Sequence, residues 1–165
     1  MLTTLSQPWT KRKDSVEYRH TQFGTVIVSL MGAPVFAISV HFLVAGSIGT
    51  AEAILAVVLL VTLFLFPSLT VTITDGTLTC SYGTGLIRKR IELSNIREAR
   101  SVNNRWIVGW GIRWVPGQYW MWNVSGLQAV ELNFNNGRRF RVGTDEPEIL
   151  VRATQLQNTS IARTN

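Results

Sequence analysis

The fold is decided by residues 23–66, which read FGTVIVSLMGAPVFAISVHFLVAGSIGTAEAILAVVLLVTLFLF. This stretch contains no Lys, Arg or Asp, and its only ionisable side chains are those of His41 and Glu52. The hydrocarbon core of a bilayer is about 30 Å thick, and a helix crosses it with roughly 20 apolar residues. The stretch is long enough for two such helices, and residues 46–50 (GSIGT) interrupt it near its middle. It therefore predicts a hairpin of two transmembrane helices, at about 23–44 and 48–66.

Two other structures are compatible with so apolar a stretch. A secretory signal peptide is disfavoured because the first span begins beyond residue 20 and a second span follows it at once. A buried helical hairpin in a soluble protein is disfavoured because such helices normally carry a charged face, which is missing here. A membrane anchor is the favoured interpretation.

The basic residues predict how the hairpin is oriented. Lys and Arg are found on both sides of the hairpin and are missing from its turn, an arrangement that places both flanks in the cytoplasm. We therefore expect a multi-pass protein of the inner (cytoplasmic) membrane, with both termini cytoplasmic and residues 1–22 forming a basic tail. His41 and Glu52 are intramembrane polar residues, which raises the hypothesis of an accessory subunit of a transporter complex. Helix contacts or an interfacial position are the simpler interpretation of both residues.

Beyond Pro67 the hydrophobic pattern changes to a period of two. The turn signals Asp75-Gly76 and Asn135-Asn136-Gly137 join alternating segments, and roughly seven short antiparallel strands are expected. Residues 145–148 (DEPE) then open an amphipathic helix, because acids favour the first turn and Pro fits near a helix start. The prediction is an all-β barrel at 67–157 with a C-terminal capping α-helix, followed by a disordered tail at 158–165.

Several motifs of this part resemble membrane-anchored bacterial proteins with a pleckstrin-homology-like (PH-like) domain. The matching segments are residues 73–78 (ITDGTL), 91–96 (IELSNI), 123–127 (NVSGL) and 143–148 (GTDEPE). The resemblance implies a PH-like barrel, a membrane location and no enzymatic activity. In eukaryotic relatives of the fold, phosphoinositides bind basic residues around the first hairpin loop. Here that loop is Asp75-Gly76, without Lys or Arg, which weakens a phosphoinositide interpretation.

Basic clusters supply candidates for binding anionic lipid head groups. The chain carries 16 Lys and Arg against 10 Asp and Glu, and cations near an anionic leaflet are attracted to it. The simpler interpretation is positive-inside bias together with solvated strand faces. The head-group candidates are Arg88, Lys89, Arg90, Arg138, Arg139 and Arg141.

Tryptophan is concentrated in one short segment. Its rings suit a membrane interface or a binding surface, although core packing and cross-strand aromatic pairs explain such residues equally well. The interface candidates are Trp106, Trp110, Trp114, Trp120 and Trp122.

The sequence contains no recognisable catalytic or metal-binding motif. His20 and His41 are far apart, Cys80 is the only cysteine, and no phosphate-binding loop or hydrolase motif occurs. We therefore expect a non-enzymatic interaction module without a cofactor, acting as a protein adaptor or a self-assembling scaffold. Its expected partners are membrane lipids, an unknown protein and a second copy of itself, and no nucleic acid. An anionic-lipid head-group sensing module is the alternative.

Overall fold

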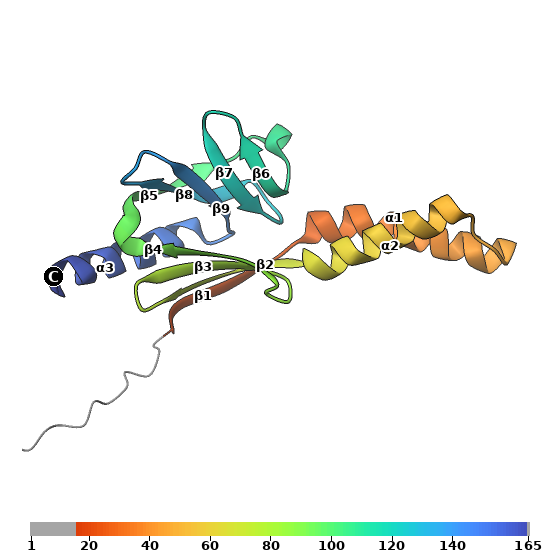
Figure 1. Ribbon diagram of the computed structural model, residues 1–165, viewed down its shortest axis with the longest axis horizontal. Coiled ribbons are helices and arrows are strands. Elements are labelled where there is room, and N and C mark those ends of the chain that lie inside the picture. Colours follow the sequence, from red (N-terminus) through yellow and green to blue (C-terminus); the bar gives the residue numbers. More distant parts are fainter. Residues whose placement is uncertain (1–15, 165) are drawn as a thin grey trace, which may run out of the picture.

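The computed structural model describes residues 16–164, which form two β-sheets, a helical hairpin and a C-terminal helix (Figure 1). The strands are β1 (Val16–Phe23), β2 (Ser68–Thr74), β3 (Thr77–Tyr82), β4 (Ile87–Glu92), β5 (Ile96–Asn103), β6 (Gly111–Val115), β7 (Tyr119–Asn123), β8 (Gln128–Phe134) and β9 (Arg139–Gly143). The helices are α1 (Thr25–Ala45), α2 (Thr50–Leu65) and α3 (Pro147–Thr164), with short 3-10 helices η1 (Leu93–Asn95) and η2 (Trp106–Val108). Residues 1–15 of the expected N-terminal tail lie outside the described residues.

The first sheet is antiparallel, in the order β1-β2-β3-β4. Its period-two pattern follows from burial of one face, because alternate side chains of a strand point to opposite sides. Along β2, Leu69, Val71 and Ile73 enter the core while the threonines between them stay half-buried.

The helical hairpin is inserted between two neighbouring strands of this sheet. Phe23 of β1 is paired with Ser68 of β2, and the Gly24 N–H donates to the Pro67 carbonyl at 2.8 Å. The chain thus leaves the sheet after Phe23 and returns to the adjacent strand at Ser68. Part of the expected tail at 1–22 is therefore strand β1. The sequence of this segment, VEYRHTQF, is polar, so it was not predicted as a strand. Its partner strand lies about 50 residues further along the chain.

The second sheet has the order β5-β8-β9-β7-β6. Strands β7 and β9 are parallel, and the other pairs are antiparallel. In the chain, the hairpin of β6 and β7 comes between β5 and β8. In the sheet, it lies on the far side of β9, with β7 paired to β9.

Helix α3 covers β5, β8 and η1 and also touches β1. Leu150 is fully buried beneath it. His20 of β1 ties the start of this helix to the first sheet: its Nε2 lies 2.5 Å from Asp145 Oδ1, and its Nδ1 lies 3.2 Å from Glu146 Oε2. Helix α3 continues to Thr164, so it takes in most of the tail expected at 158–165.

The core lies between the two sheets and extends to the base of the hairpin. The Tyr82 ring lies 5.0 Å from that of Phe66 and 5.1 Å from that of Trp122, and Trp122 in turn packs against Phe140 at 6.1 Å between ring centroids. This aromatic row joins the end of α2, the first sheet and the second sheet.

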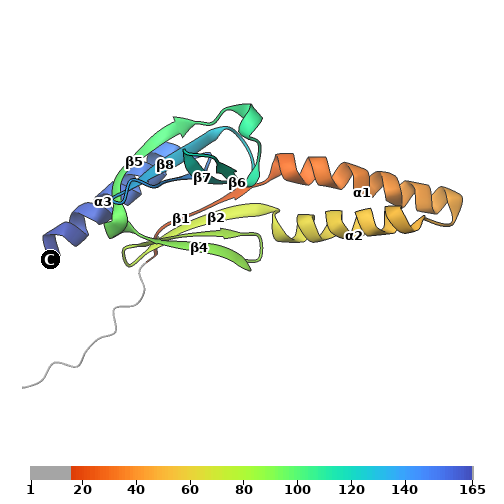
Figure 2. The same cartoon turned by 45° about the horizontal axis from the view of Figure 1, so that its top comes forward.

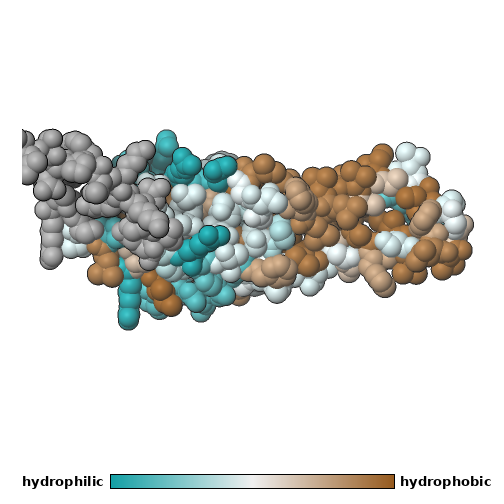
Figure 3. All heavy atoms as spheres, turned by 90° about the horizontal axis from the view of Figure 1, so that it is seen from below, coloured by the Kyte–Doolittle hydropathy of each residue, from teal (hydrophilic) through white to brown (hydrophobic). Residues whose placement is uncertain are grey.

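Helices α1 and α2 project from the sheets as an antiparallel pair (Figures 1 and 2). Their surface is almost wholly apolar and exposed, and Figure 3 shows this apolar surface covering the end of the molecule that the hairpin forms. Within the part of the chain that the structure describes, α1 is the one helix long and apolar enough to cross a membrane; α2, with 16 residues, is shorter than the roughly 20 that a span needs.

These findings correct the expected fold class. Residues 16–164 contain nine strands in two separate sheets, where about seven in one barrel were expected, and one candidate span instead of two. The unexpected strand is β1, which precedes the apolar stretch; strands β2 to β9 all follow Pro67, where the strands were expected. The two helices begin and end within two residues of the expected bounds, but the turn occupies residues that the second helix would need for a full span.

Candidate functional site

A cleft with a volume of about 670 Å³ opens between β4 and β9. Its size falls within the range of about 300–1,000 Å³ that is usual for ligand pockets. Four basic residues and one acid line it, so its formal charge is +3. The lining residues are Lys89, Arg90, Ile91, Glu92, Asn95, Trp120, Phe134, Asn135, Asn136, Arg138, Arg139 and Phe140.

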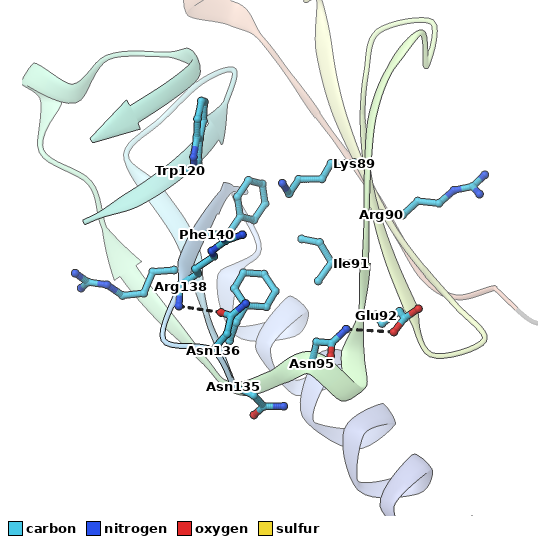
Figure 4. Close-up of a pocket in the computed structure, with 12 residues that line it drawn as sticks. Lys89, Arg90, Ile91, Glu92, Asn95, Trp120, Asn135, Asn136, Arg138 and Phe140 are labelled. Carbon is cyan, nitrogen blue, oxygen red and sulfur yellow. Dashed lines mark hydrogen bonds between the residues drawn. The ribbon is translucent and has the colours of Figure 1, made fainter. Parts of the chain in front are cut away.

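Strand β4 directs its basic side chains to both faces of the sheet. Lys89 points into the cleft, where its Nζ lies 5.1 Å from the centroid of the Phe140 ring, whereas Arg90 points away from the cleft (Figure 4). Arg88 is exposed, as alternation requires. The three consecutive candidates of the sequence analysis are therefore separated, and Lys89 is the one that faces the aromatic floor.

The opposite wall of the cleft comes from β9 and the turn before it. The Arg138 N–H donates to Asn136 Oδ1 at 3.0 Å, which shapes the turn, and the Arg138 side chain stays exposed (Figure 4). The Asn135 N–H donates to the Asn95 carbonyl at 3.0 Å and so ties this turn to η1. The turn signal at residues 135–137 was visible in the sequence, but its position beside η1 depends on the packing of the sheets.

Arg141, a predicted head-group ligand, belongs to a buried network instead. Its Nε lies 2.7 Å from Glu131 Oε2, its Nη1 donates to Asn104 Oδ1 at 3.0 Å, and its guanidinium lies 3.7 Å from the Tyr119 ring centroid. Arg100 Nε donates to the other Glu131 oxygen at 3.0 Å. This network joins β5, β8 and β9, and it leaves Arg141 little capacity to bind an external anion.

The carboxylate of Glu131 is fully buried and yet remains charged. Burial opposes ionisation, but hydrogen bonds and charge from Arg100 and Arg141 outweigh it and lower the pKa of Glu131. Sequence reasoning missed this residue. The only signal was an acid in the otherwise apolar run AVEL of β8.

The structure divides the five tryptophans into several environments. Trp122 is buried in the aromatic row, and Trp110 packs against the core while its Nε1 donates to the Gly126 carbonyl at 3.1 Å. Trp114 and Trp120 form an exposed cross-strand pair with ring centroids 6.3 Å apart. Trp106 is exposed on η2. Core packing and surface exposure, both left open by the sequence, each apply to some of these residues.

His41 and Glu52 lie next to each other near the tip of the hairpin. His41 Nδ1 is 3.1 Å from Glu52 Oε1, and the other Glu52 oxygen accepts from the Gly49 N–H at 2.9 Å. These contacts close the turn between α1 and α2. The two polar side chains therefore have hydrogen-bond partners within the hairpin itself.

The chemistry of the cleft favours binding over catalysis. Its charged groups are mainly Lys and Arg, and its one carboxylate, Glu92, accepts a hydrogen bond from Asn95 at 3.1 Å. Among the described residues no group of three His, Cys, Asp or Glu is placed to hold a metal ion. The cleft offers cations, which suit an anionic ligand, and aromatic rings, which can pack against apolar parts of that ligand.

A scan against protein-family models found none that matches this chain, and a search of curated proteins found no match either.

Proposed function

We propose that the protein is a membrane-anchored, non-enzymatic interaction module whose basic cleft receives an extended acidic segment of a partner protein. The observation that carries this proposal is the cleft between β4 and β9, with its excess of positive charge and its aromatic floor. The expected resemblance to bacterial PH-like proteins stays a prediction, and the proposal does not depend on it.

Membrane anchoring is supported by α1. The helix has 21 residues, which corresponds to about 31 Å at 1.5 Å per residue and so matches the hydrocarbon core. A cleaved signal sequence is disfavoured because cleavage behind α1 would remove β1 from the first sheet. Helix α2 packs along α1 and returns the chain to β2, which pairs with β1, so both sheets lie at the same end of the hairpin. The basic flanks favour the cytoplasmic side of the inner membrane.

An extended segment is favoured by the open edge of β4. This strand is the last in its sheet and pairs with β3 alone among the described strands. Unpaired N–H and C=O groups along such an edge are a template for an added strand. A partner segment of about six residues would match the length of β4 and bring acidic side chains to Lys89 and Arg138.

A protein is favoured over a lipid because of where the cleft lies. Strand β4 starts at the end of the sheet that carries the hairpin and runs away from it. The cleft begins near Lys89 and continues to Asn95 and Asn136, which lie still further from α1 and α2. A head group of the bilayer that holds α1 would lie at the opposite end of β4.

Charge reversal in the cleft should weaken the binding of acidic peptides. We expect full-length protein in lipid nanodiscs, screened against displayed ten-residue peptides, to enrich acidic sequences. Arg138→Glu should weaken the best acidic peptide roughly tenfold, about 1.4 kcal/mol, because a like charge replaces an attractive one. Affinity is measured by fluorescence anisotropy of the labelled peptide.

Arg152→Glu on the exposed face of α3 makes the same charge change away from the cleft and should bind as the unaltered protein does. Selection of peptides without net negative charge, or equal binding by both variants, would contradict the proposal.

A further inference from the structure

The end of the sheets from which the hairpin emerges consists of three loops, which we call the rim: residues 83–86, 105–110 and 124–127. Figures 1 and 2 show these loops at the end of the sheets that faces the hairpin, with 105–110 lying further to the side of α1 and α2 than the other two. The rim is the part of the sheets nearest to any membrane that α1 enters.

Specific contacts hold two rim loops against the hairpin. Gly83 has a φ of 45°, and a Cβ added there would lie 2.7 Å from the Leu65 carbonyl oxygen, so the turn before β4 reaches the end of α2 only because glycine has no side chain. In the loop before β8, Ser125 Oγ lies 2.8 Å from Thr25 Oγ1 at the start of α1.

The third rim loop is tied to the second. The Asn104 N–H donates to the Leu127 carbonyl at 2.7 Å, and Trp110 Nε1 donates to the Gly126 carbonyl at 3.1 Å. These bonds hold η2 beside residues 124–127. The three loops are thus a fixed surface and have no flexible linker to the hairpin.

Large apolar side chains are exposed on this surface. Trp106, Ile107 and Leu86 are 74%, 70% and 69% exposed, and Leu127 is partly exposed as well. Single exposed apolar residues are ordinary, but a group of them at one end of a domain marks a contact surface.

The charge near the rim has one sign. The segments 83–88, 105–113 and 124–127 contain Arg88, Arg105 and Arg113 and neither Asp nor Glu. All three arginines are exposed. Aromatic and aliphatic side chains flanked by arginines match the boundary of a bilayer, where rings lie at head-group level and cations meet lipid phosphates.

We propose that the rim rests on the bilayer, with Trp106, Ile107 and Leu86 in the interfacial layer and the three arginines at lipid phosphates. This inference rests on the membrane anchoring proposed above and adds a second contact between the protein and the lipid. Lipid is the occupant because the rim loops contact the ends of α1 and α2, whose surface is apolar. The hairpin leaves the first sheet after Phe23 and returns to it at Ser68, beside these loops. The contact would hold the cleft in one orientation, directed away from the membrane.

Fluorescence quenching by spin-labelled lipids tests this contact in the full-length protein. Ile107→Cys is labelled with an environment-sensitive fluorophore in nanodiscs of phosphatidylcholine and phosphatidylglycerol, with or without a doxyl group at acyl position 5. Cys80 is buried, and burial raises its pKa to about 12, so the introduced thiol is the one that reacts. We expect the label at position 107 to be quenched roughly twofold, as for a side chain at the interface.

Two further positions make the outcomes distinguishable. A label at Gln155→Cys, exposed on α3, should not be quenched, and a label at Phe36→Cys, in the middle of α1, should be quenched by lipids with doxyl at acyl position 12. Quenching at 36 without quenching at 107 would overturn the rim contact and leave the anchor intact. Absence of quenching at both positions would overturn the anchor as well, and equal quenching at 107 and 155 would show that the rim has no special contact.

Discussion

Replacing residues 24–67 by Asn-Gly is expected to release the protein from membranes and leave both sheets folded. Phe23 and Ser68 are register partners at the end of an antiparallel pair, and a two-residue Asn-Gly turn is the connection that such a pair favours. The exposed apolar surface of α1 and α2 disappears with the deletion. The measurement is partitioning between carbonate-washed membranes and the soluble fraction, with circular dichroism of the purified soluble protein.

A shorter variant that begins at Ser68 provides the comparison. It lacks β1, which contributes Tyr18 to the core and His20 to the start of α3. It also exposes the edge of β2, and an open apolar edge invites aggregation. We expect this variant to aggregate or to fail to fold. If it folds as well as the Asn-Gly variant, β1 is dispensable; if the Asn-Gly variant stays in carbonate-washed membranes, the hairpin is not the main anchor.

Replacing Glu131 by Ala should destabilise the protein by about 3 kcal/mol or more, because removal of one partner from a buried ion pair leaves the other charge uncompensated. Arg141 is the residue most affected, since its side chain is largely buried whereas that of Arg100 is half exposed and can be solvated. Urea denaturation of the full-length protein in detergent, followed by tryptophan fluorescence, measures the difference. Glu98→Ala, which removes a surface carboxylate of the neighbouring strand β5, should change stability by less than about 0.5 kcal/mol. Similar losses for both variants would contradict a special role for the network.

The same network predicts a dependence on pH. The pKa of Glu131 is lowered in the folded protein, so its contribution to stability is fully present above the unfolded value of about 4.3 and is lost as the pH falls through the folded pKa. The free energy of unfolding, measured by urea denaturation, should therefore differ between the unaltered protein and Glu131→Gln at pH 7. The two values should approach each other in acid. A constant difference between pH 7 and pH 3 would show that the charge of Glu131 does not matter.

Local pattern accounts for the parts of the structure that the sequence predicted well. The apolar stretch at 23–66 forms two helices, and alternation in residues such as Leu69, Val71 and Ile73 produces a strand with one buried face. The helix that begins at Pro147 follows from acids and proline at its start. In these cases the residues that decide the conformation lie within a few positions of each other.

The candidate site was predicted only in part. Lys89, Arg90, Arg138, Arg139 and Trp120 line the cleft as members of the predicted sets, whereas Arg141 is paired internally and Trp122 is buried. Phe140 and Asn95 were missed, because an apolar residue in a strand and an amide beside a turn carry no sign of what packs against them.

By itself, the sequence determined the apolar hairpin, the β-rich nature of the rest and the excess of positive charge, since these depend on composition and on short periodicities. Tertiary structure decided that β1 belongs to the first sheet, that the strands form two sheets, and that Lys89 and Arg138 line one cleft. Each of these depends on contacts between residues distant in the chain, about 50 positions apart for β1 with β2 and for Lys89 with Arg138. The free energy of such contacts comes from burial and pairing that exist only once the sheets have packed.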